Sequence, residues 1–379
     1  MSKTGLVFAG GGVKGSYQVG VWKALLEMGI QVDCVVGTSI GSVNGALFAQ
    51  GELDTAQKLW ETITIGDIIR LENSTVTDVF EIKSLLELTG EIKKNWGLDI
   101  TPFRELLCEV IDEEKIRNSP IEYGLTTFSL NEFKELELFK EDIPQGMLID
   151  YLLAGSCLPV FQSKKVENKL LLDGGMGNNI PADMLLARGA DTLIVVDVGG
   201  VGITKPVDTT GINVFSIRCS EKIVGVLEFN QENILKNMKA GYYDCFRAFG
   251  RLCGETYYFN VGDYHKKRQK YSKKMMQQIE TAADVFGIER LAVYEIDRLI
   301  GGILKAYEAA KQAYQRMKQD LSVETVLKGN LKLDEKTLTV WLVGLFEEKN
   351  PDVLGGKLAK GMLSRPYQAA SAVLYLKNQ

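Results

Sequence analysis

The sequence predicts an α/β fold with a mostly parallel central sheet, followed by a mainly helical C-terminal region. Two apolar stretches near the N-terminus, residues 6–9 and 32–36, each lead into a glycine-containing turn and then into a segment with helical spacing. Short apolar strands that alternate with helices are typical of a parallel sheet buried on both faces. After about residue 220 the pattern changes to long segments with helical spacing. We therefore expect two parts, residues 1–220 and 221–379.

The elements of the first part follow from apolar periodicity and from turn residues. Residues 14–28 have apolar side chains at helical spacing and stop before Gly29, a residue type that commonly ends helices. Thr101 and Pro102 fit a helix start, with threonine as the N-cap and proline at the first helical position. The other expected elements are helices at 40–50, 52–60, 148–154 and 181–188, and strands at 123–129, 135–139, 170–172, 193–196 and 214–217.

The second part reads as helices. Apolar side chains recur at helical spacing from Ile288 to Tyr314, and residues 334–346 and 367–376 continue the pattern. Six of the nine residues 266–274 are basic. Such a run indicates either a solvated helix face or a surface that contacts anionic lipid head groups.

Composition excludes several classes of protein. The chain of 379 residues is 45% hydrophobic and 25% charged, which is typical of a globular protein, and its net charge of −5 argues against a nucleic-acid partner. Its six cysteines form no Cys-x-x-Cys pair and have no histidine nearby, so we expect reduced thiols and no metal site. The N-terminal apolar stretch is too short for a secretory signal, and no uncharged apolar run of about 18 residues is present. We expect a cytoplasmic protein whose membrane contact, if any, is peripheral.

A candidate nucleophile lies between the second strand and the second helix. Residues 37–41 read Gly-Thr-Ser-Ile-Gly, the Gly-x-Ser-x-Gly pattern of a nucleophile elbow. Gly37 and Gly41 give steric room, and the turn would present the Ser39 hydroxyl at a helix N-terminus, where the helix dipole favours developing negative charge. The alternative is a glycine-rich turn whose serine only caps the helix.

The group that would activate Ser39 is unusual. Serine hydrolases usually use a histidine, yet the chain has one histidine, His265, in a polar stretch without strand-to-turn character. Asp173 is the better candidate, because it follows an apolar strand and precedes two glycines. If that strand is parallel to its neighbours, its carboxyl end meets the edge that carries Ser39.

Two alternatives remain open for this acid. Asp173 could instead form an ordinary Asx-turn, and Asp197 also follows an apolar strand. Asn178 and Asn179 follow Asp173 closely and could hold its loop through hydrogen bonds.

A glycine-rich loop precedes the first helix. Residues 10–15 read Gly-Gly-Gly-Val-Lys-Gly and formally match the Gly-x-Gly-x-x-Gly pattern of dinucleotide-binding folds. That reading needs an acid at the far end of the second strand. Asp33 has about the right spacing but lies at the start of that strand, whereas the far end carries Ser39. The glycines can instead leave backbone N–H groups free to face an oxyanion, or form a plain tight turn.

Taken in order, the glycine loop, the Ser39 elbow and the sequence Asp173-Gly174-Gly175 resemble the patatin-like phospholipases. Residues 154–159, Ala-Gly-Ser-Cys-Leu-Pro, are also similar to the segment that precedes the acid-bearing loop in that family. The likeness covers roughly residues 5–200. It implies a three-layer α/β/α fold, a serine–aspartate dyad without a catalytic histidine, no cofactor, and hydrolysis of ester bonds in phospholipids or other acyl lipids.

The resemblance also implies roles for individual residues. Ser39 would be the nucleophile and Asp173 the base, and Lys14 would either contact a lipid phosphate or be an ordinary solvated lysine. Amides from the glycine loop and the elbow would form the oxyanion hole, namely those of Gly10, Gly11, Gly12 and Ile40. The supporting motif glycines are Gly15, Gly37, Gly41, Gly174 and Gly175. A catalytically silent lipid- or partner-binding protein on the same fold is the alternative. The lipid head group, the acyl position, the oligomeric state and the role of residues 221–379 are left open.

Overall fold

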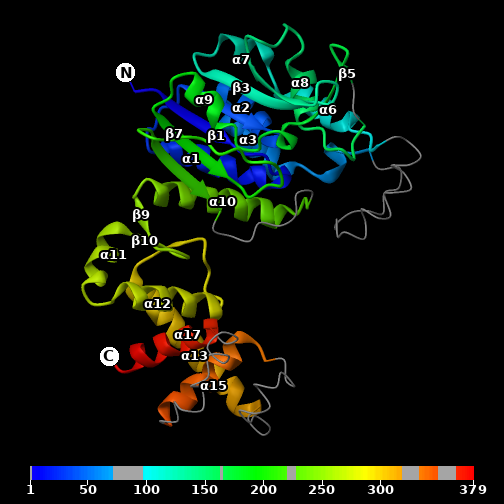
Figure 1. The fold of residues 1–379 in the computed structure, drawn as a ribbon. Coiled ribbons are helices and arrows are strands. Elements are labelled where there is room, and N and C mark those ends of the chain that lie inside the picture. The colour runs from blue at the N-terminus through cyan, green and yellow to red at the C-terminus, as the bar shows by residue number, and fades with distance from the viewer. Residues whose placement is uncertain (1, 71–96, 163–164, 220–227, 318–332, 349–363) are drawn as a thin grey trace. The chain divides into compact units, whose positions relative to one another are not determined.

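The computed structural model describes residues 2–70, 97–162, 165–219, 228–317, 333–348 and 364–379 (Figure 1). Contacts divide the chain into two compact units, Met1–Phe249 and Gly250–Gln379. In the described ranges, no helix is both long enough and apolar enough to cross a bilayer.

The first unit is built around a mostly parallel sheet, as the sequence predicts. Its described strands follow the order β5-β6-β3-β2-β1-β7-β8, and β4 pairs with β3 outside this path. Neighbours are parallel from β3 through β2, β1 and β7 to β8, whereas β4 and β6 are antiparallel to β3. The strands are β1 (Thr4–Phe8), β2 (Cys34–Thr38), β3 (Glu122–Ser129), β4 (Lys134–Phe139), β5 (Lys165–Val166), β6 (Lys169–Asp173), β7 (Thr192–Asp197) and β8 (Asn213–Arg218).

Helices cover both faces of this sheet, which gives three layers. Val7 and Leu193 belong to one buried cluster with Leu185 of α9 (Ala182–Ala187). On the next residue of β1, Phe8 packs its ring edge-on against Phe48 of α2 (Ile40–Gln50), with ring centroids 6.2 Å apart. Successive strand side chains point to opposite faces, so these two contacts place α9 and α2 on different sides of the sheet.

The other elements of the first unit agree with the expected order and differ at their ends. The segment 14–28 begins as a 3₁₀ turn, η1 (Gly12–Gly15), before α1 (Ser16–Glu27). Thr101 is not an N-cap as predicted, because it is the first residue of α6, and Asp99 instead accepts hydrogen bonds from its amide and hydroxyl. The remaining elements are α3 (Leu53–Thr62), η2 (Ile65–Asp67), α6 (Thr101–Val110), α7 (Glu113–Asn118), α8 (Leu148–Gly155), η3 (Gly174–Met176) and α10 (Gln231–Ala248).

Strands β2 and β6 pair with the same edge of β3, one after the other. β2 pairs with residues 122–126 of β3 and β6 with residues 127–129, while β4 occupies the opposite edge along 124–129. β2 ends at Thr38 and β6 runs in the other direction to end at Asp173. The expectation that Asp173 ends a parallel strand is therefore wrong. The acid reaches the Ser39 edge because an antiparallel strand enters from beyond the end of β2.

Helix α10 belongs to the first unit, although the sequence placed the boundary near residue 220. It packs along α1, where a Cβ on Gly20 would lie 1.8 Å from the Met238 carbonyl oxygen and one on Gly241 2.0 Å from that of Tyr17. Two glycines thus allow the backbones of the two helices to come close. The Tyr17 hydroxyl donates to Asp244 at 2.8 Å across the same contact.

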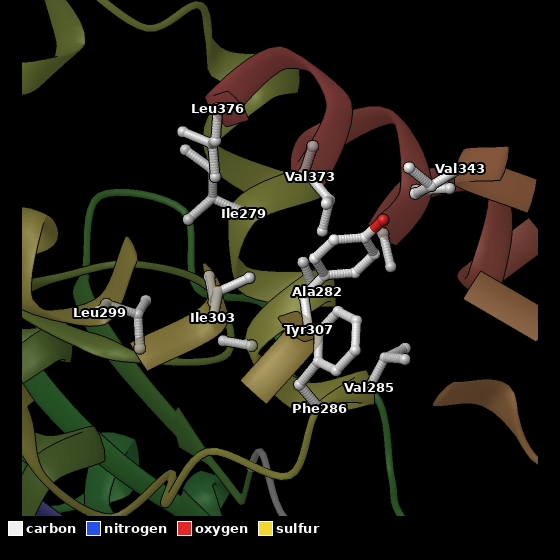
Figure 2. Close-up of a cluster of buried hydrophobic side chains, with 14 of the residues drawn as sticks. Ile279, Ala282, Val285, Phe286, Leu299, Ile303, Tyr307, Val343, Val373 and Leu376 are labelled. Atoms are coloured by element: carbon white, nitrogen blue, oxygen red, sulfur yellow. The ribbon is translucent and has the colours of Figure 1, made fainter. Parts of the chain in front are cut away.

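The second unit is a helical bundle with a small sheet. Its core gathers buried side chains from four helices, among them Ile279, Ile303, Val343 and Val373 (Figure 2). The helices are α11 (Val261–Arg268), α12 (Lys273–Val285), α13 (Ile296–Met317), α15 (Glu335–Glu347) and α17 (Ser364–Lys377). The strands, which the sequence did not predict, are β9 (Leu252–Cys253), β10 (Tyr258–Asn260) and β11 (Val293–Tyr294). The helical pattern from Ile288 therefore holds only from Ile296 onward.

Candidate active site

Ser39 occupies a strained turn between β2 and α2. Its backbone has φ 56° and ψ −130°, outside the regions that residues other than glycine normally adopt. A Cβ on Gly41 would lie 2.2 Å from the Phe8 carbonyl oxygen, and one on Gly37 2.2 Å from that of Gly41, so the turn requires both glycines. The Ser39 side chain makes no hydrogen bond to the start of α2. The alternative that this serine only caps the helix is therefore not what the structure shows.

The carboxyl group of Asp173 is buried next to Ser39. Only 6% of the residue is exposed, and its Oδ1 accepts a hydrogen bond from the Gly175 amide at 2.8 Å. Burial raises the pKa of Asp173, and hydrogen bonding from the Ser39 hydroxyl and the Gly175 amide only partly opposes this rise. Oδ2 is fully buried and has no hydrogen-bond partner among the described residues.

A cluster of hydroxyl groups fixes the point where β2 and β6 meet. The Thr38 and Thr126 hydroxyl oxygens are 2.9 Å apart, and the Thr38 hydroxyl also donates to the Asn178 carbonyl at 2.9 Å. A Cβ on Gly174 would lie 2.2 Å from the Thr126 hydroxyl oxygen. The glycine after Asp173 therefore lets this turn sit directly against β3.

The glycine loop presents free amides beside Ser39. Gly12 has φ 58°, a conformation that favours glycine. In the part of the chain that the structure describes, the amides of Gly11, Gly12 and Ile40 have no hydrogen-bond acceptor. The Gly10 amide differs, because it donates to the Asn179 carbonyl at 3.3 Å. Gly10 thus supports the loop, and its amide is already used.

Asn179 ties the glycine loop to the segment that follows Asp173. Its side-chain amide donates to the Gly10 carbonyl at 3.2 Å, and its backbone amide donates to the Ile203 carbonyl at 2.6 Å. Lys14, the candidate phosphate contact, donates from Nζ to the Gly199 carbonyl at 2.9 Å. Lys14 therefore links the glycine loop to the loop that follows β7.

A buried network of polar side chains joins the glycine loop to α2 and α3. Asn44 of α2 donates to the Gly15 carbonyl at 2.9 Å and to the Gln18 side chain at 2.8 Å. Gln18 donates to the Ala9 carbonyl at 2.6 Å, and the Trp60 indole donates to Asn44 at 3.1 Å. The network joins both ends of the loop to the elbow helix.

A cavity of about 60 Å³ opens beside Ser39. Among the described residues that line it, Ser39 and Ser156 carry the hydroxyl groups. The rest of the lining is apolar apart from Gly12 and comes from six separate segments: Val13, Ile40, Trp60, Ile63, Ile68, Phe103, Leu158, Phe161 and Phe229. Such a lining suits a hydrocarbon chain.

The structure gives Asp33 and Asp197 hydrogen-bond partners other than Ser39. Asp33 accepts a hydrogen bond from the Thr4 amide at 2.7 Å, at the edge of the sheet where β1 begins. Asp197 bonds the Gly199 amide at 2.9 Å and pairs with Arg218 at 3.2 Å. His265 is an exposed residue of α11 in the second unit. In the basic run that follows it, Lys267 pairs with Asp297 at 2.5 Å.

Sequence reasoning missed several residues at this site. Asn44 carries a weak signal, because it is a polar residue in a largely apolar helix, whereas Trp60 lies in a helix of mixed composition and carries none. Ser156 was noted only as part of the segment 154–159. Phe229 had no local signal, since it reaches the cavity through the packing of α10 on α1.

Comparison with known proteins finds a family model that matches part of the first unit. Residues 6–186 match the family model described as patatin-like phospholipase. Patatin-like phospholipase domain-containing protein 7 of Rattus norvegicus is 32% identical over 197 residues, covering 51% of this chain and 13% of that protein. Patatin-like phospholipase domain-containing protein 6 of Homo sapiens is 31% identical over 199 residues, covering 51% of this chain and 13% of that protein. Lysophospholipase nte1 of Aspergillus terreus is 27% identical over 214 residues, covering 53% of this chain and 12% of that protein.

These matches span about half of this chain and a small part of each curated relative. Among solved structures, the crystal structure of VipD from Legionella pneumophila aligns with 99% of this chain and 92% of its own, at 13% identity and a TM-score of 0.45. The match to the patatin-like phospholipase family model therefore covers residues 6–186, which is just under half of this chain.

Proposed function

We propose that the chain is a lipid acyl hydrolase that cleaves carboxylic ester bonds of phospholipids or related acyl lipids. The family match supports lipid hydrolysis in general. The observation that carries the proposal is the meeting of Ser39 with the buried Asp173 beside an apolar cavity. This arrangement combines a nucleophile, a base and space for an acyl chain.

In the proposed reaction Asp173 accepts the proton of Ser39 while the Ser39 oxygen attacks the acyl carbonyl carbon. The alcohol or lysolipid leaves with that proton, and an acyl-enzyme remains. Water then gives a proton to Asp173, attacks the acyl carbon, and Ser39 recovers its proton as the fatty acid is released.

The environment of Asp173 supports its role as the base. An ordinary carboxylate is a weak base toward a serine hydroxyl, whereas burial raises the pKa of Asp173 and thus its basicity. The buried Oδ2 of Asp173 has no hydrogen-bond partner among the described residues, so it is available to accept the proton of Ser39.

The free amides of Gly11, Gly12 and Ile40 would stabilise the oxyanion. These amides lie at the elbow and in the glycine loop, and they have no hydrogen-bond acceptor among the described residues. They are therefore free to donate to a developing negative charge. Each such donor contributes about 3–4 kcal/mol to transition-state stabilisation. Gly10 is the exception among the expected donors, because its amide is bonded to Asn179.

The proposal is tested by the rate of p-nitrophenyl ester hydrolysis by the full chain. Ser39→Ala and Asp173→Asn should each abolish turnover, whereas His265→Ala, the matched control for an ordinary serine hydrolase, should keep it. Complete loss of turnover in His265→Ala would overturn the proposed pairing of Ser39 with Asp173.

Lipid products extend the test to the natural class of substrate. Wild type should release free fatty acid from phospholipid vesicles, and Ser39→Ala should release none. A chain that binds lipid, releases no fatty acid and resists labelling of Ser39 by a fluorophosphonate would instead be the catalytically silent alternative.

A further inference from the structure

We propose that the Ser156 hydroxyl binds the oxygen atom that exchanges a proton with Asp173, which is the leaving oxygen in the first step and the water oxygen in the second. This inference rests on the proposed function and adds a catalytic residue to it.

Ser156 has the properties of a group waiting for a polar partner. It follows α8, is 7% exposed, and its Oγ is fully buried without a hydrogen-bond partner among the described residues. Buried hydroxyl groups without partners are rare in folded proteins, because they forfeit the hydrogen bonds they had with water. Ser156 shares its cavity with Ser39, and the walls around it are largely apolar. The lining therefore leaves the polar part of a substrate as the partner.

The order of the elements shows which polar atom this is. The glycine loop follows β1, and Ser39 follows β2, which lies between β1 and β3. Asp173 ends β6, which pairs with β3 beyond the end of β2. Helix α8 packs against β3 and β6, and the Asp173 amide donates to the carbonyl of Cys157, the residue after Ser156, at 2.9 Å. Ser156 therefore lies next to Asp173 on the β3 side of the nucleophile, and the amides of the glycine loop lie on the β1 side.

The chemistry requires one oxygen on that side in each half of the reaction. In the first step the bond between the Ser39 oxygen and the acyl carbon forms, the bond to the alkoxy oxygen breaks, and the proton passes through Asp173 to that oxygen. In the second step a water oxygen takes the same place, forms the new bond to the acyl carbon, and returns a proton through Asp173 to Ser39. Ser156 donates a hydrogen bond to the leaving oxygen as its negative charge develops, and it neither gains nor loses a proton.

The test compares two esters of one short fatty acid, the p-nitrophenyl ester and the glyceryl ester. Nitrophenolate leaves without needing a proton or a donor, whereas the glyceryl alkoxide needs both. For Ser156→Ala, kcat/KM should fall about tenfold on the glyceryl ester, the size of one lost hydrogen bond, and change little on the nitrophenyl ester. The melting temperature of this variant should be equal to or higher than that of wild type, because the substitution removes an unpartnered buried group.

Ser129→Ala is the matched control. Ser129 is also a buried serine of the first unit, but its hydroxyl oxygen accepts a hydrogen bond from the Glu132 amide at 3.3 Å. This variant should lose stability and keep the wild-type ratio of kcat/KM on the two esters.

An equal change on both esters for Ser156→Ala, including no change, would overturn the inference, as would a lower melting temperature with an unchanged ratio. In those cases an active wild type leaves the proposed function standing. A wild-type chain that hydrolyses neither ester refutes the proposed function, and the inference with it.

Discussion

Thr38 and Asp173 end two strands of opposite direction that pair with adjacent residues of β3. Thr38 pairs with Thr126, and Asp173 pairs with Thr127. Because one edge of β3 accepts both strands in succession, their ends face each other. Ser39 and the buried acid are thereby brought together by hydrogen bonds of the sheet, which are more rigid than loop contacts.

We expect Thr38→Val to weaken this junction. The substitution keeps the shape of the side chain but removes the hydroxyl that contacts Thr126 and Asn178. The free energy of unfolding should fall by about 1–3 kcal/mol, and kcat should fall as well because Ser39 and Asp173 lose their alignment. Thr339→Val is the control: it removes a buried hydroxyl bonded to the Glu335 carbonyl in the second unit, so it should cost stability and leave kcat unchanged.

The raised pKa of Asp173 predicts the pH dependence of the reaction. As the base, Asp173 must be ionised, so kcat/KM should rise with pH and level off above the raised pKa of this carboxyl group. The acidic limb should therefore lie above pH 3.8, the ordinary pKa of an aspartate. A pH–rate profile with a limb at the ordinary value would contradict this role for a buried Asp173.

The same shift predicts a stability change in the opposite sense to that of a salt-bridged acid. Because the folded pKa is raised, the folded chain binds this proton more tightly than the unfolded chain, and the free energy of unfolding falls as pH rises from 3.8 through the raised value. Asp173→Asn stays neutral and avoids the loss. Its melting temperature should exceed that of wild type at pH 7, and the difference should shrink in acid.

The network around Asn44 should matter more for the reaction than for substrate binding. Asn44→Ala leaves Gly15, Gln18 and Trp60 without their shared partner and should cost about 3 kcal/mol of stability. We expect kcat to fall because the glycine loop is held less firmly, with a smaller change in KM. Trp60→Phe removes one of these bonds and should show a smaller effect in the same direction. A Trp60→Phe variant with a greater loss of kcat than Asn44→Ala would argue against this order.

Close packing of α1 on α10 makes Gly20 intolerant of a side chain. In Gly20→Ala the new Cβ would overlap the Met238 carbonyl oxygen, so α10 must move and stability should fall by several kcal/mol, of the order seen when cores are overpacked. Gly301→Ala in α13 is the matched control, because nothing lies within 4 Å of the added carbon. That variant should gain up to about 1 kcal/mol from helix propensity. Thermal or urea unfolding of the two variants checks both signs.

Much of the fold follows from local patterns in the sequence. The alternation of short apolar strands with helices predicted the parallel core, and the Ser39 elbow with its helix at residues 40–50 was predicted at the observed bounds. The sequence predicted that Asp173 lies at the edge of the sheet that carries Ser39, but it predicted the wrong direction for the strand of Asp173. The direction of a strand depends on long-range pairing, which an apolar run does not encode. Strands β9 to β11 have two or three residues each, too few to show a period.

The site could be predicted only where its residues carry a local motif. The glycine loop and the elbow are each a contiguous stretch of sequence, so residue spacing reveals them. Ser156 and Phe229 meet the cavity because α8 and α10 pack where they do. An amphipathic helix pattern shows that a face is buried but not which partner buries it. For the same reason, the sequence did not reveal that α10 packs in the first unit.

Helix α10 sets the length of the shortest fragment that could retain the site. Trimming the chain at residue 220 would remove the wall formed by Phe229, uncover the face of α1 around Gly20, and remove Phe249, whose ring stacks on Phe215 of β8 at 4.3 Å. Recombinant work on the isolated first unit should therefore retain the polypeptide through Phe249.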